Sequence, residues 1–376
     1  MAHIEKRVDQ LGKPYRARWR TPDGKARSKA FDRRIDAERF LASVENSKAI
    51  GTYVDPLLGR VTVDEWLTQW LDDVTPTLKP KTIASYESLL RSRIIPSIGA
   101  LRLASLRPSD IQRWIGAMQS SGLSASRIRQ AVVLVKQALD AAVQDGRIGR
   151  NVCQGVKLPT IQHREAEYFE PNVVDYIAEN ITPPYDLLTR ILGVLGLRWG
   201  EAVALRRQDV DLLSRRLHVR QALAEVNGHF VFGPTKSHAA RNVPLSPALA
   251  TELDAHLESL SEPPDTLLFT GPKGGPLRYR YVYMRLWRPT LDDLKLPSVG
   301  LHVLRHSAAA RLISAGASVK AVQTILGHRS AAFSLTVYGH LFDADLDDLA
   351  ARLDRPASAP RPQIRGSSDR HSKKVL

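Results

Sequence analysis

LGHRSAAFSLTVYGH, from Leu326 to His340, is the stretch that decides how this chain is interpreted, together with HVLRH (His302–His306) before it. Histidine, arginine and tyrosine side chains gathered in this way could fill a core, bind a metal ion or form a catalytic set. A metal site is not supported, because the chain has no H-E-x-x-H motif and no suitably spaced acidic partner. Taken singly, His302 and His328 could also cap helices. The choice therefore depends on residues upstream.

Further polar residues of this kind lie earlier in the chain. GLRWGEAVAL contains Arg198 and Glu201, and GPTKSHAARNVPL contains Lys236. Alone, Arg198 and Glu201 could form an ion pair at the edge of a core, since residues three apart on a helix are neighbours. In chain order the set is Arg, Lys, H-x-x-R, His and Tyr. This combination favours a catalytic site over a series of unrelated structural roles.

Composition limits the class of protein. The chain has 376 residues, with 54 Lys or Arg against 39 Asp or Glu and a formal net charge of +15. That charge indicates a polyanionic partner, most simply nucleic acid, although a ribosome-associated protein would look similar. The length is enough for two or three domains. The single cysteine excludes a disulfide framework within one chain, and a reducing cytoplasm fits. The stretch MAHIEKRVDQ is no signal peptide, and no run is long enough for a membrane helix.

The ordered set resembles the active site of the tyrosine recombinase family. Its members here are Arg198, Lys236, His302, Arg305, His328 and Tyr338. The resemblance runs from about Val61 to Leu353, and with the N-terminal segment it extends to phage integrases that bind arm-type DNA sites. Any one motif is weak, whereas all of them in this order are specific. The family cuts and rejoins DNA through a 3′-phosphotyrosyl link, so the resemblance implies no metal, ATP or other cofactor.

The resemblance also implies a role for each cationic residue. The transition state gains negative charge on the non-bridging phosphate oxygens, and the planar, permanently charged guanidiniums of Arg198 and Arg305 suit its neutralisation. Lys236 is the general acid that protonates the leaving 5′-oxygen. His302, one helical turn before Arg305, assists proton transfer and faces the same phosphate. His328 donates a hydrogen bond to the scissile phosphate.

Tyr338 is the expected nucleophile, because it follows the LGH motif at the spacing that the family shows. Glu201 is expected to orient an active-site side chain from outside the reacting set. His306 has no clear family role and is interpreted as structural. Three other tyrosines alternate with basic residues and are interpreted as structural or DNA-facing: Tyr279, Tyr281 and Tyr283.

The chain divides into segments of different pattern. We expect an arm-type DNA-binding domain at 1–58, a helical core-binding domain at 61–156, a catalytic domain at 160–355 and a disordered basic tail at 356–376. The predicted fold class is multidomain. It comprises a small β-hairpin or sheet plus a helix, an all-α domain, and a mixed, mainly α domain with a small antiparallel sheet. The resemblance implies that the last two domains form a C-shaped clamp around core DNA.

The N-terminal segment predicts a hairpin. YRARWR (Tyr15–Arg20) and ARSKAF (Ala26–Phe31) flank TPDGK, whose Asp-Gly pair is a turn signal. Side chains repeat every two residues along a strand, so three arginines share one face. That face could be solvated or could contact DNA, and we prefer DNA contact for Arg16, Arg18 and Arg20.

A helix and a linker are expected to follow. Asp32 is the expected N-cap, Gly51 the stop, and the apolar face comprises Ile35, Phe40, Leu41 and Val44. TYVDPLLGR reads as a linker.

The core-binding segment has helical signals throughout. Thr62 and Glu65 fit a capping box, a later helix begins at a Ser109/Asp110 cap, and a long helix ends near Gly146. Its basic residues could clamp phosphates or be solvated, and the candidates for DNA contact are Lys79, Lys81 and Arg91.

The catalytic segment predicts helices at Glu170–Ile181 and Pro184–Leu212. Strands at Arg215–Val226 and His229–Gly233 flank Asn227-Gly228, a hairpin signal, and ARNVPLS supplies a third strand.

Partners follow from the resemblance. These are double-stranded DNA attachment sites of core and arm type, a homotetramer on DNA, and possible accessory proteins, namely a DNA-bending host factor and an excision factor. The location would be bacterial cytoplasm, with no membrane. An amphipathic stripe of Leu341, Leu346, Leu349 and Leu353 could dock on a neighbouring protomer or pack in cis. Two alternatives stay open: a DNA-binding regulator with an inactive site, and a relaxing enzyme similar to type IB topoisomerases.

Overall fold

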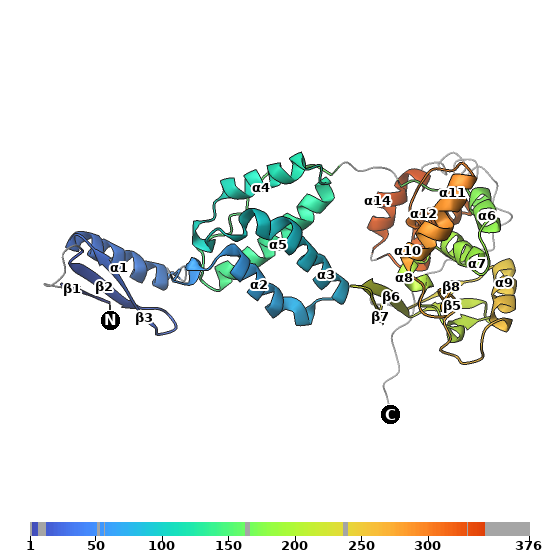
Figure 1. The fold of residues 1–376 in the computed structure, drawn as a ribbon, viewed down its shortest axis with the longest axis horizontal. Helices are drawn as coiled ribbons and strands as arrows, with labels where there is room; N and C mark the ends of the chain where they lie inside the picture. The colour runs from blue at the N-terminus through green and yellow to red at the C-terminus, as the bar shows by residue number, and fades with distance from the viewer. Residues whose placement is uncertain are drawn as a thin grey trace, which may run out of the picture. The chain divides into compact units, whose positions relative to one another are not determined.

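A computed structural model describes residues 2–6, 13–50, 53–55, 57–161, 166–235, 240–328 and 330–342 (Figure 1). Lys236, Gly51, the predicted leucine stripe beyond residue 342 and the predicted tail at 356–376 lie outside the described residues. Contacts divide the chain into two compact units, Met1–His163 with Val226–Gly228, and Arg164–Glu225 with His229–Leu376.

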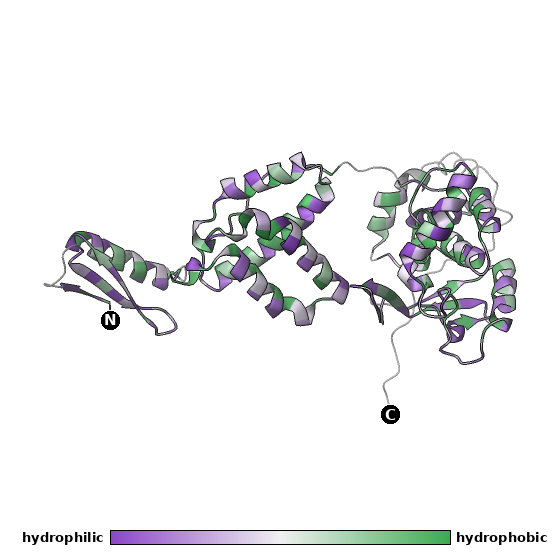
Figure 2. Cartoon of the chain, viewed as in Figure 1, coloured by the Kyte–Doolittle hydropathy of each residue, from purple (hydrophilic) through white to green (hydrophobic). Residues whose placement is uncertain are grey.

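The first unit begins with a small antiparallel sheet in the order β1-β2-β3, comprising β1 (His3–Lys6), β2 (Tyr15–Arg20) and β3 (Ala26–Phe31). Both predicted strands are confirmed, and β1 was not predicted. Ala17 and Trp19 of β2 are buried in a cluster with residues of helix α1 (Arg34–Ala49). The alternating arginines therefore occupy the face of β2 that points away from α1, and purple, hydrophilic stretches mark β2 and β3 in Figure 2.

Two expectations for this region were wrong, and a third was incomplete. The N-cap of α1 is Arg33 rather than Asp32, and no side chain caps it. Ile35 is 49% exposed, because at 100° per residue it lies about 160° around the helix from the buried Ala37. The predicted linker is partly anchored: Asp55 is buried, and its carboxylate accepts hydrogen bonds from Arg27 Nε and Nη2 at 2.9 and 2.7 Å.

Four main helical segments complete the first unit. They are α2 (Val63–Val74), α3 (Pro80–Leu89), which continues into the π-helical η3 (Leu90–Gly99), α4 (Pro108–Ser120) and α5 (Ala125–Gln144). Short turns lie at η1 (Leu58–Arg60), η2 (Thr75–Thr77) and η4 (Leu103–Ser105). Trp66 and Trp114 anchor the core through indole N–H donors to the carbonyls of Ala138 and Arg93, at 2.8 and 3.0 Å. Lys79, Lys81 and Arg91 are exposed.

The cap assignments in this bundle were partly right. The capping box of Thr62 and Glu65 is confirmed, with hydrogen bonds of 2.7 and 3.2 Å. The start of α4 was misplaced, because Arg107 is the N-cap and Pro108 the first helical residue. Asp110 contributes from inside the helix, where its carboxylate accepts the Arg107 N–H at 2.9 Å.

The second unit begins with helices, and the long helix predicted at Pro184–Leu212 is broken into shorter pieces. Helix α6 (Pro171–Glu179) is followed by α7 (Tyr185–Arg190), the π-helical η5 (Ile191–Leu195) and the short α8 (Trp199–Ala202). The break falls at Gly196, which has φ +65° and leaves no room for a side chain, since an added Cβ would lie 2.3 Å from Leu326 Cδ2. This break brings the chain against Leu326, near the end of helix α13 (Val319–Leu326), immediately before Arg198.

The predicted first strand is in fact two strands. After η6 (Arg207–Asp209), β4 (Val210–Asp211) and β5 (Arg216–Val219) form a sheet in the order β4-β5-β8, and β8 (Arg241–Pro244) confirms the third predicted strand. β6 (Gln221–Val226) pairs with β7 (His229–Pro234) in a separate hairpin. Its turn has positive φ at both Asn227 and Gly228, as the Asn-Gly signal requires. Val219 pairs with Arg241, so β5 holds the start of β8 in place.

Helices are the main elements in the rest of this unit, whose described residues pack around buried Trp287, Phe269 and Leu304. They are α9 (Pro247–Glu258), α10 (Tyr279–Val282), η7 (Tyr283–Trp287), α11 (Arg288–Asp293), α12 (His302–Ser314), α13 (Val319–Leu326) and α14 (Ala331–Phe342). The last three share a small core that includes Ile313, Leu326 and Tyr338. Among the described residues, no helix has the length and apolar character needed to cross a membrane.

Candidate active site

Three arginines surround the C-terminal end of α13. The last helical carbonyls lack partners within their own helix and carry partial negative charge. Here the carbonyl of Ile325 accepts from Arg241 Nε at 2.8 Å, that of Leu326 from Arg305 Nη2 at 2.8 Å, and that of Gly327 from Arg198 Nη2 at 3.0 Å. One helix end thus collects guanidiniums from three distant parts of the chain.

Glu201 joins two of these arginines and is 1% exposed. Its Oε1 accepts from Arg198 Nη1 at 2.9 Å, and its two oxygens accept from Arg241 at 3.1 and 2.7 Å. Burial would raise the pKa of Glu201, but the hydrogen bonds and charges of Arg241 and Arg198 bring that pKa below its ordinary value. The carboxylate is therefore ionised at neutral pH and fixes the orientation of Arg198.

Arg305 is the most enclosed of the three cations, at 3% exposure. Its Nη1 donates to the carbonyl of Gly196 at 2.5 Å in addition to the bond with Leu326. Burial, with the nearby charge of Arg198, lowers the pKa of Arg305 to about 9. The guanidinium stays charged at pH 7, and a buried cation of this kind attracts anionic oxygen strongly.

Tyr338 lies on α14 with only 2% of its surface exposed. Its hydroxyl is 2.8 Å from His306 Nδ1, and its ring stacks on that of His328 with centroids 6.1 Å apart. Burial raises the pKa of Tyr338 to about 12, although the charge of Arg305 opposes the rise. The phenol is therefore neutral in this state.

The histidines occupy different depths. His328 is buried, and its Nδ1 is 2.8 Å from Ser334 Oγ. The ring of His306 lies 4.9 Å from that of His302, centroid to centroid, in an edge-on arrangement. His302 is exposed and lines an open hollow of about 480 Å³ together with His306 and Glu167. Within the described residues, no cluster of three or more His, Cys, Asp or Glu side chains is arranged to hold a metal ion.

Comparison with known proteins gives this site its context. Residues 167–345 match the phage integrase family, and residues 62–119 match the N-terminal SAM-like domain of phage integrases. Together these matches cover more than half of the chain. The integrase of Mycobacterium phage L5 is 26% identical over 311 residues, covering 79% of this chain and 82% of its own. The chain is a tyrosine recombinase of the phage integrase family. As such it breaks and rejoins DNA at specific sites.

Solved recombinases share the fold of this one. The Tn1549 transposon integrase, in complex with a circular intermediate DNA, superposes with a TM-score of 0.68 at 23% identity, covering 78% of this chain and 99% of that one. A lambda integrase tetramer bound to a Holliday junction gives a TM-score of 0.56 at 20% identity, covering 87% and 96%.

The recombinase gathers most of the predicted site residues in one place, namely Arg198, Glu201, Arg305, His328 and Tyr338. His302 lies at the exposed edge, and Lys236 is outside the described residues. Two residues were missed. His306 was interpreted as structural, yet it contacts the Tyr338 hydroxyl. Its position four residues after His302 on one helix was the available signal. Arg241 had no signal beyond its place at the start of a strand.

The half-buried His306 makes the stability of the recombinase depend on pH. Burial, with His302 and Arg305 nearby, lowers the pKa of His306 to about 4, against an ordinary value of 6.5. Between these values the unfolded chain binds a proton that the folded chain excludes, so the free energy of unfolding falls as pH falls. Between pH 7 and pH 5 we expect His306→Asn to lose about 1 kcal/mol less stability than the native protein, allowing for partial exposure of the ring.

Urea unfolding at both pH values measures this difference. Exposed His229 on β7 supplies the control His229→Asn, which should retain the native pH dependence. Identical pH dependence in His306→Asn and the native protein would contradict the prediction.

Proposed function

We propose that Tyr338 attacks the scissile phosphate and forms a 3′-phosphotyrosyl link, releasing the 5′-hydroxyl of the cleaved strand. The 5′-hydroxyl of a partner strand then attacks the phosphotyrosyl phosphorus, which forms a new phosphodiester and frees the Tyr338 phenol. The observation that carries this proposal is the position of the Tyr338 phenol beside His328 and within the electrostatic reach of Arg305. The energy of the phosphodiester is kept in the covalent link, so rejoining requires no nucleotide.

Arg198 and Arg305 bind the non-bridging oxygens. Only two of the five N–H groups of Arg305 have protein partners among the described residues, which leaves donors for phosphate. Preorganised cations stabilise the transition state because they need no reorientation during the reaction. Lys236 supplies the proton to the leaving 5′-oxygen, and Glu201 holds Arg198 in its orientation.

The histidines handle hydrogen bonds and protons. If the Ser334 hydroxyl donates to His328 Nδ1, the neutral ring carries its proton on Nε2 and can donate it to the phosphate. His306 holds the phenol, and His302 links that contact to the hollow, assisting proton transfer out of the site. A phosphate cannot reach the hydroxyl while Tyr338 is only 2% exposed and its phenol contacts His306. Helix α14 must therefore shift when DNA binds.

A nicked core-site duplex that traps the cleaved strand tests this function. The expected product is a protein–DNA adduct that survives denaturation, forms in excess chelator, and yields a single peptide modified at Tyr338. Adduct formation that stops on chelation, or a modified peptide lacking Tyr338, would reject the proposal. Relaxation of plasmids without an attachment site would instead favour the topoisomerase-like alternative, and sequence-specific binding without any adduct would favour the regulator.

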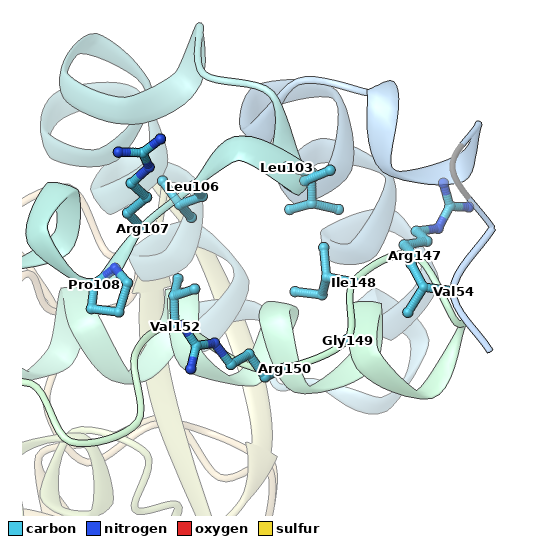
Figure 3. A pocket seen from close by; sticks show the side chains of 11 residues that line it. Val54, Leu103, Leu106, Arg107, Pro108, Arg147, Ile148, Gly149, Arg150 and Val152 are labelled. Atoms are coloured by element: carbon cyan, nitrogen blue, oxygen red, sulfur yellow. The ribbon is translucent and has the colours of Figure 1, made fainter. Parts of the chain in front are cut away.

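The first unit contributes two proposed DNA contacts. Residues 1–58 form the arm-type domain, with Arg16, Arg18 and Arg20 facing DNA. Residues 61–156 form the core-binding domain, with contacts from Lys79, Lys81 and Arg91. A second basic feature supports the latter. A hollow of about 300 Å³ is lined by several arginines (Figure 3), namely Arg107, Arg147 and Arg150.

The arm contact has a measurable signature in salt. Combining Arg16→Ala, Arg18→Ala and Arg20→Ala should weaken arm-site binding and flatten the plot of log affinity against log salt by about 2–3 units, since each lost phosphate contact contributes about 0.9. Core-site binding should stay within about twofold. The matched control replaces three exposed arginines of the α1 region: Arg33, Arg34 and Arg39. Equal losses from both triples would indicate only non-specific attraction.

The assembled enzyme is proposed to be a homotetramer on two duplexes in the bacterial cytoplasm, assisted by a DNA-bending host protein and an excision factor. The residues after Asp343 are proposed to couple protomers. Deleting them should spare single-site binding and abolish synapsis, and unchanged recombination would contradict that role.

A further inference from the structure

Arg241 is a buried arginine that the proposed chemistry does not use. It is the first residue of β8, and its pairing with Val219 fixes its backbone. Its side chain is 7% exposed. A cation held this far from water needs close partners, because removing its hydration costs free energy.

The contacts of Arg241 connect three separate parts of the site. Nη1 and Nη2 donate to the two oxygens of Glu201 at 3.1 and 2.7 Å, and Nε donates to the carbonyl of Ile325 at 2.8 Å. The guanidinium also packs against Gly327, where an added Cβ would lie 2.9 Å from Nη1 and 3.0 Å from Cζ. Gly327 has φ +68°, so both its conformation and its contact with Arg241 disfavour larger residues.

Each of those parts carries a residue of the proposed active site. Glu201 holds Arg198 through Nη1, and Gly327 accepts from Arg198 Nη2. Gly327 is also the residue before His328. A shift of the Arg241 guanidinium would therefore move Arg198 through the carboxylate and His328 through the turn that ends α13.

We propose that Arg241 is a positioning residue of the recombinase: it fixes Glu201 and the last turn of α13 so that Arg198 is aimed at the scissile phosphate, without touching DNA itself. This inference rests on the proposed function of Arg198. A lysine could not fully replace Arg241, because a single ammonium group lacks the planar fork that meets two carboxylate oxygens and a carbonyl together.

The charge of the group supports positioning over a purely structural ion pair. Among the described residues, one carboxylate, Glu201, lies between two guanidiniums, so this part of the site carries a net positive charge. An ion pair that served stability alone would be neutral, because excess buried charge is unfavourable. The excess cation is useful where an anionic phosphate completes the cluster.

The test compares Arg241→Met and Arg241→Lys with the native protein in single-turnover cleavage of a trapped core-site duplex. Two substrates are used, one natural and one with a methylphosphonate at the scissile position, where a methyl group replaces one non-bridging oxygen and removes the charge. We expect Arg241→Met to cleave the natural substrate about 10²-fold more slowly, the usual effect of misplacing a catalytic group by about 1 Å. On the neutral substrate the loss should shrink to less than about fivefold, since one non-bridging oxygen and the charge of the linkage are gone and Arg198 has less negative charge to neutralise. On the natural substrate, the cleavage rate of Arg241→Lys should lie between those of the native protein and Arg241→Met.

Binding and folding controls keep the outcomes distinct. Core-site affinity should stay within about threefold in both variants, because Arg241 touches no DNA. Arg207→Met is the matched control, since Arg207 is a half-buried arginine that donates to the carbonyl of Leu257 outside this cluster. Thermal unfolding identifies a variant that does not fold, in which case Arg241→Lys alone decides.

Native cleavage rates in both variants would overturn the inference, as would equal losses on both substrates, which indicate general damage to the site. A native protein that forms no adduct would instead overturn the proposed function, leaving the two failures distinguishable.

Discussion

Tyr338→Phe is expected to abolish covalent attachment to DNA while leaving DNA binding intact. The substitution removes one oxygen and keeps the ring that stacks on His328. Without that oxygen no phosphotyrosyl link can form, and strand cleavage should fall by at least about 10⁴-fold, as for other nucleophiles removed from a preorganised site. Denaturing gels of the trapped duplex measure the adduct, and gel shift of the intact duplex measures affinity.

The matched control for this variant is Tyr279→Phe. Tyr279 is one of three tyrosines that alternate with basic residues, and it stacks on Tyr283 with centroids 5.9 Å apart. It should form adduct at the native rate. Strand exchange that persists in Tyr338→Phe would contradict the assignment of the nucleophile. A modest loss of stability in Tyr338→Phe is consistent with Tyr338 being the nucleophile. His306 Nδ1 lacks its partner in that variant, which costs about 1 kcal/mol.

Much of the site could be predicted because the signals were local in sequence. Arg198 with Glu201, and His302 with Arg305, are each pairs three residues apart, and the family pattern supplied their order. The capping box of Thr62 and the Asn-Gly hairpin were equally local. In each case the interaction that fixes the structure lies within a few residues, where periodicity and turn chemistry apply.

The features that were missed depend on contacts distant in sequence. The hydroxyl of Tyr338 meets His306 across two helices, and Arg241 meets Glu201 and Ile325 from another part of the chain. The long helix predicted through Gly196 breaks because the packing of Leu326 leaves no room for a side chain there. The exposure of Ile35 is different, because it depends only on local helical geometry. Placing each residue at 100° around the helix axis would have put Ile35 on the face opposite Ala37.

Arg305→Met is expected to have the second largest effect on cleavage. Arg305 is the most enclosed of the three site arginines, and its charge acts on the Tyr338 hydroxyl. Loss of a preorganised cation at a developing phosphate charge typically slows a reaction about 10³-fold or more. Cleavage of the natural duplex should therefore fall by about that factor.

A methylphosphonate at the scissile position separates this role from a structural one. Since that linkage carries no charge on its non-bridging atoms, the penalty for losing Arg305 should drop to about tenfold or less. The residual loss reflects the carbonyls of Gly196 and Leu326, which lose their donor and loosen the end of α13. Arg311→Met, on the same helix and more exposed, should leave both substrates unaffected. If the neutral linkage gave no recovery, charge neutralisation by Arg305 would be the wrong explanation, and the residue would serve only to join α12 to the end of α13.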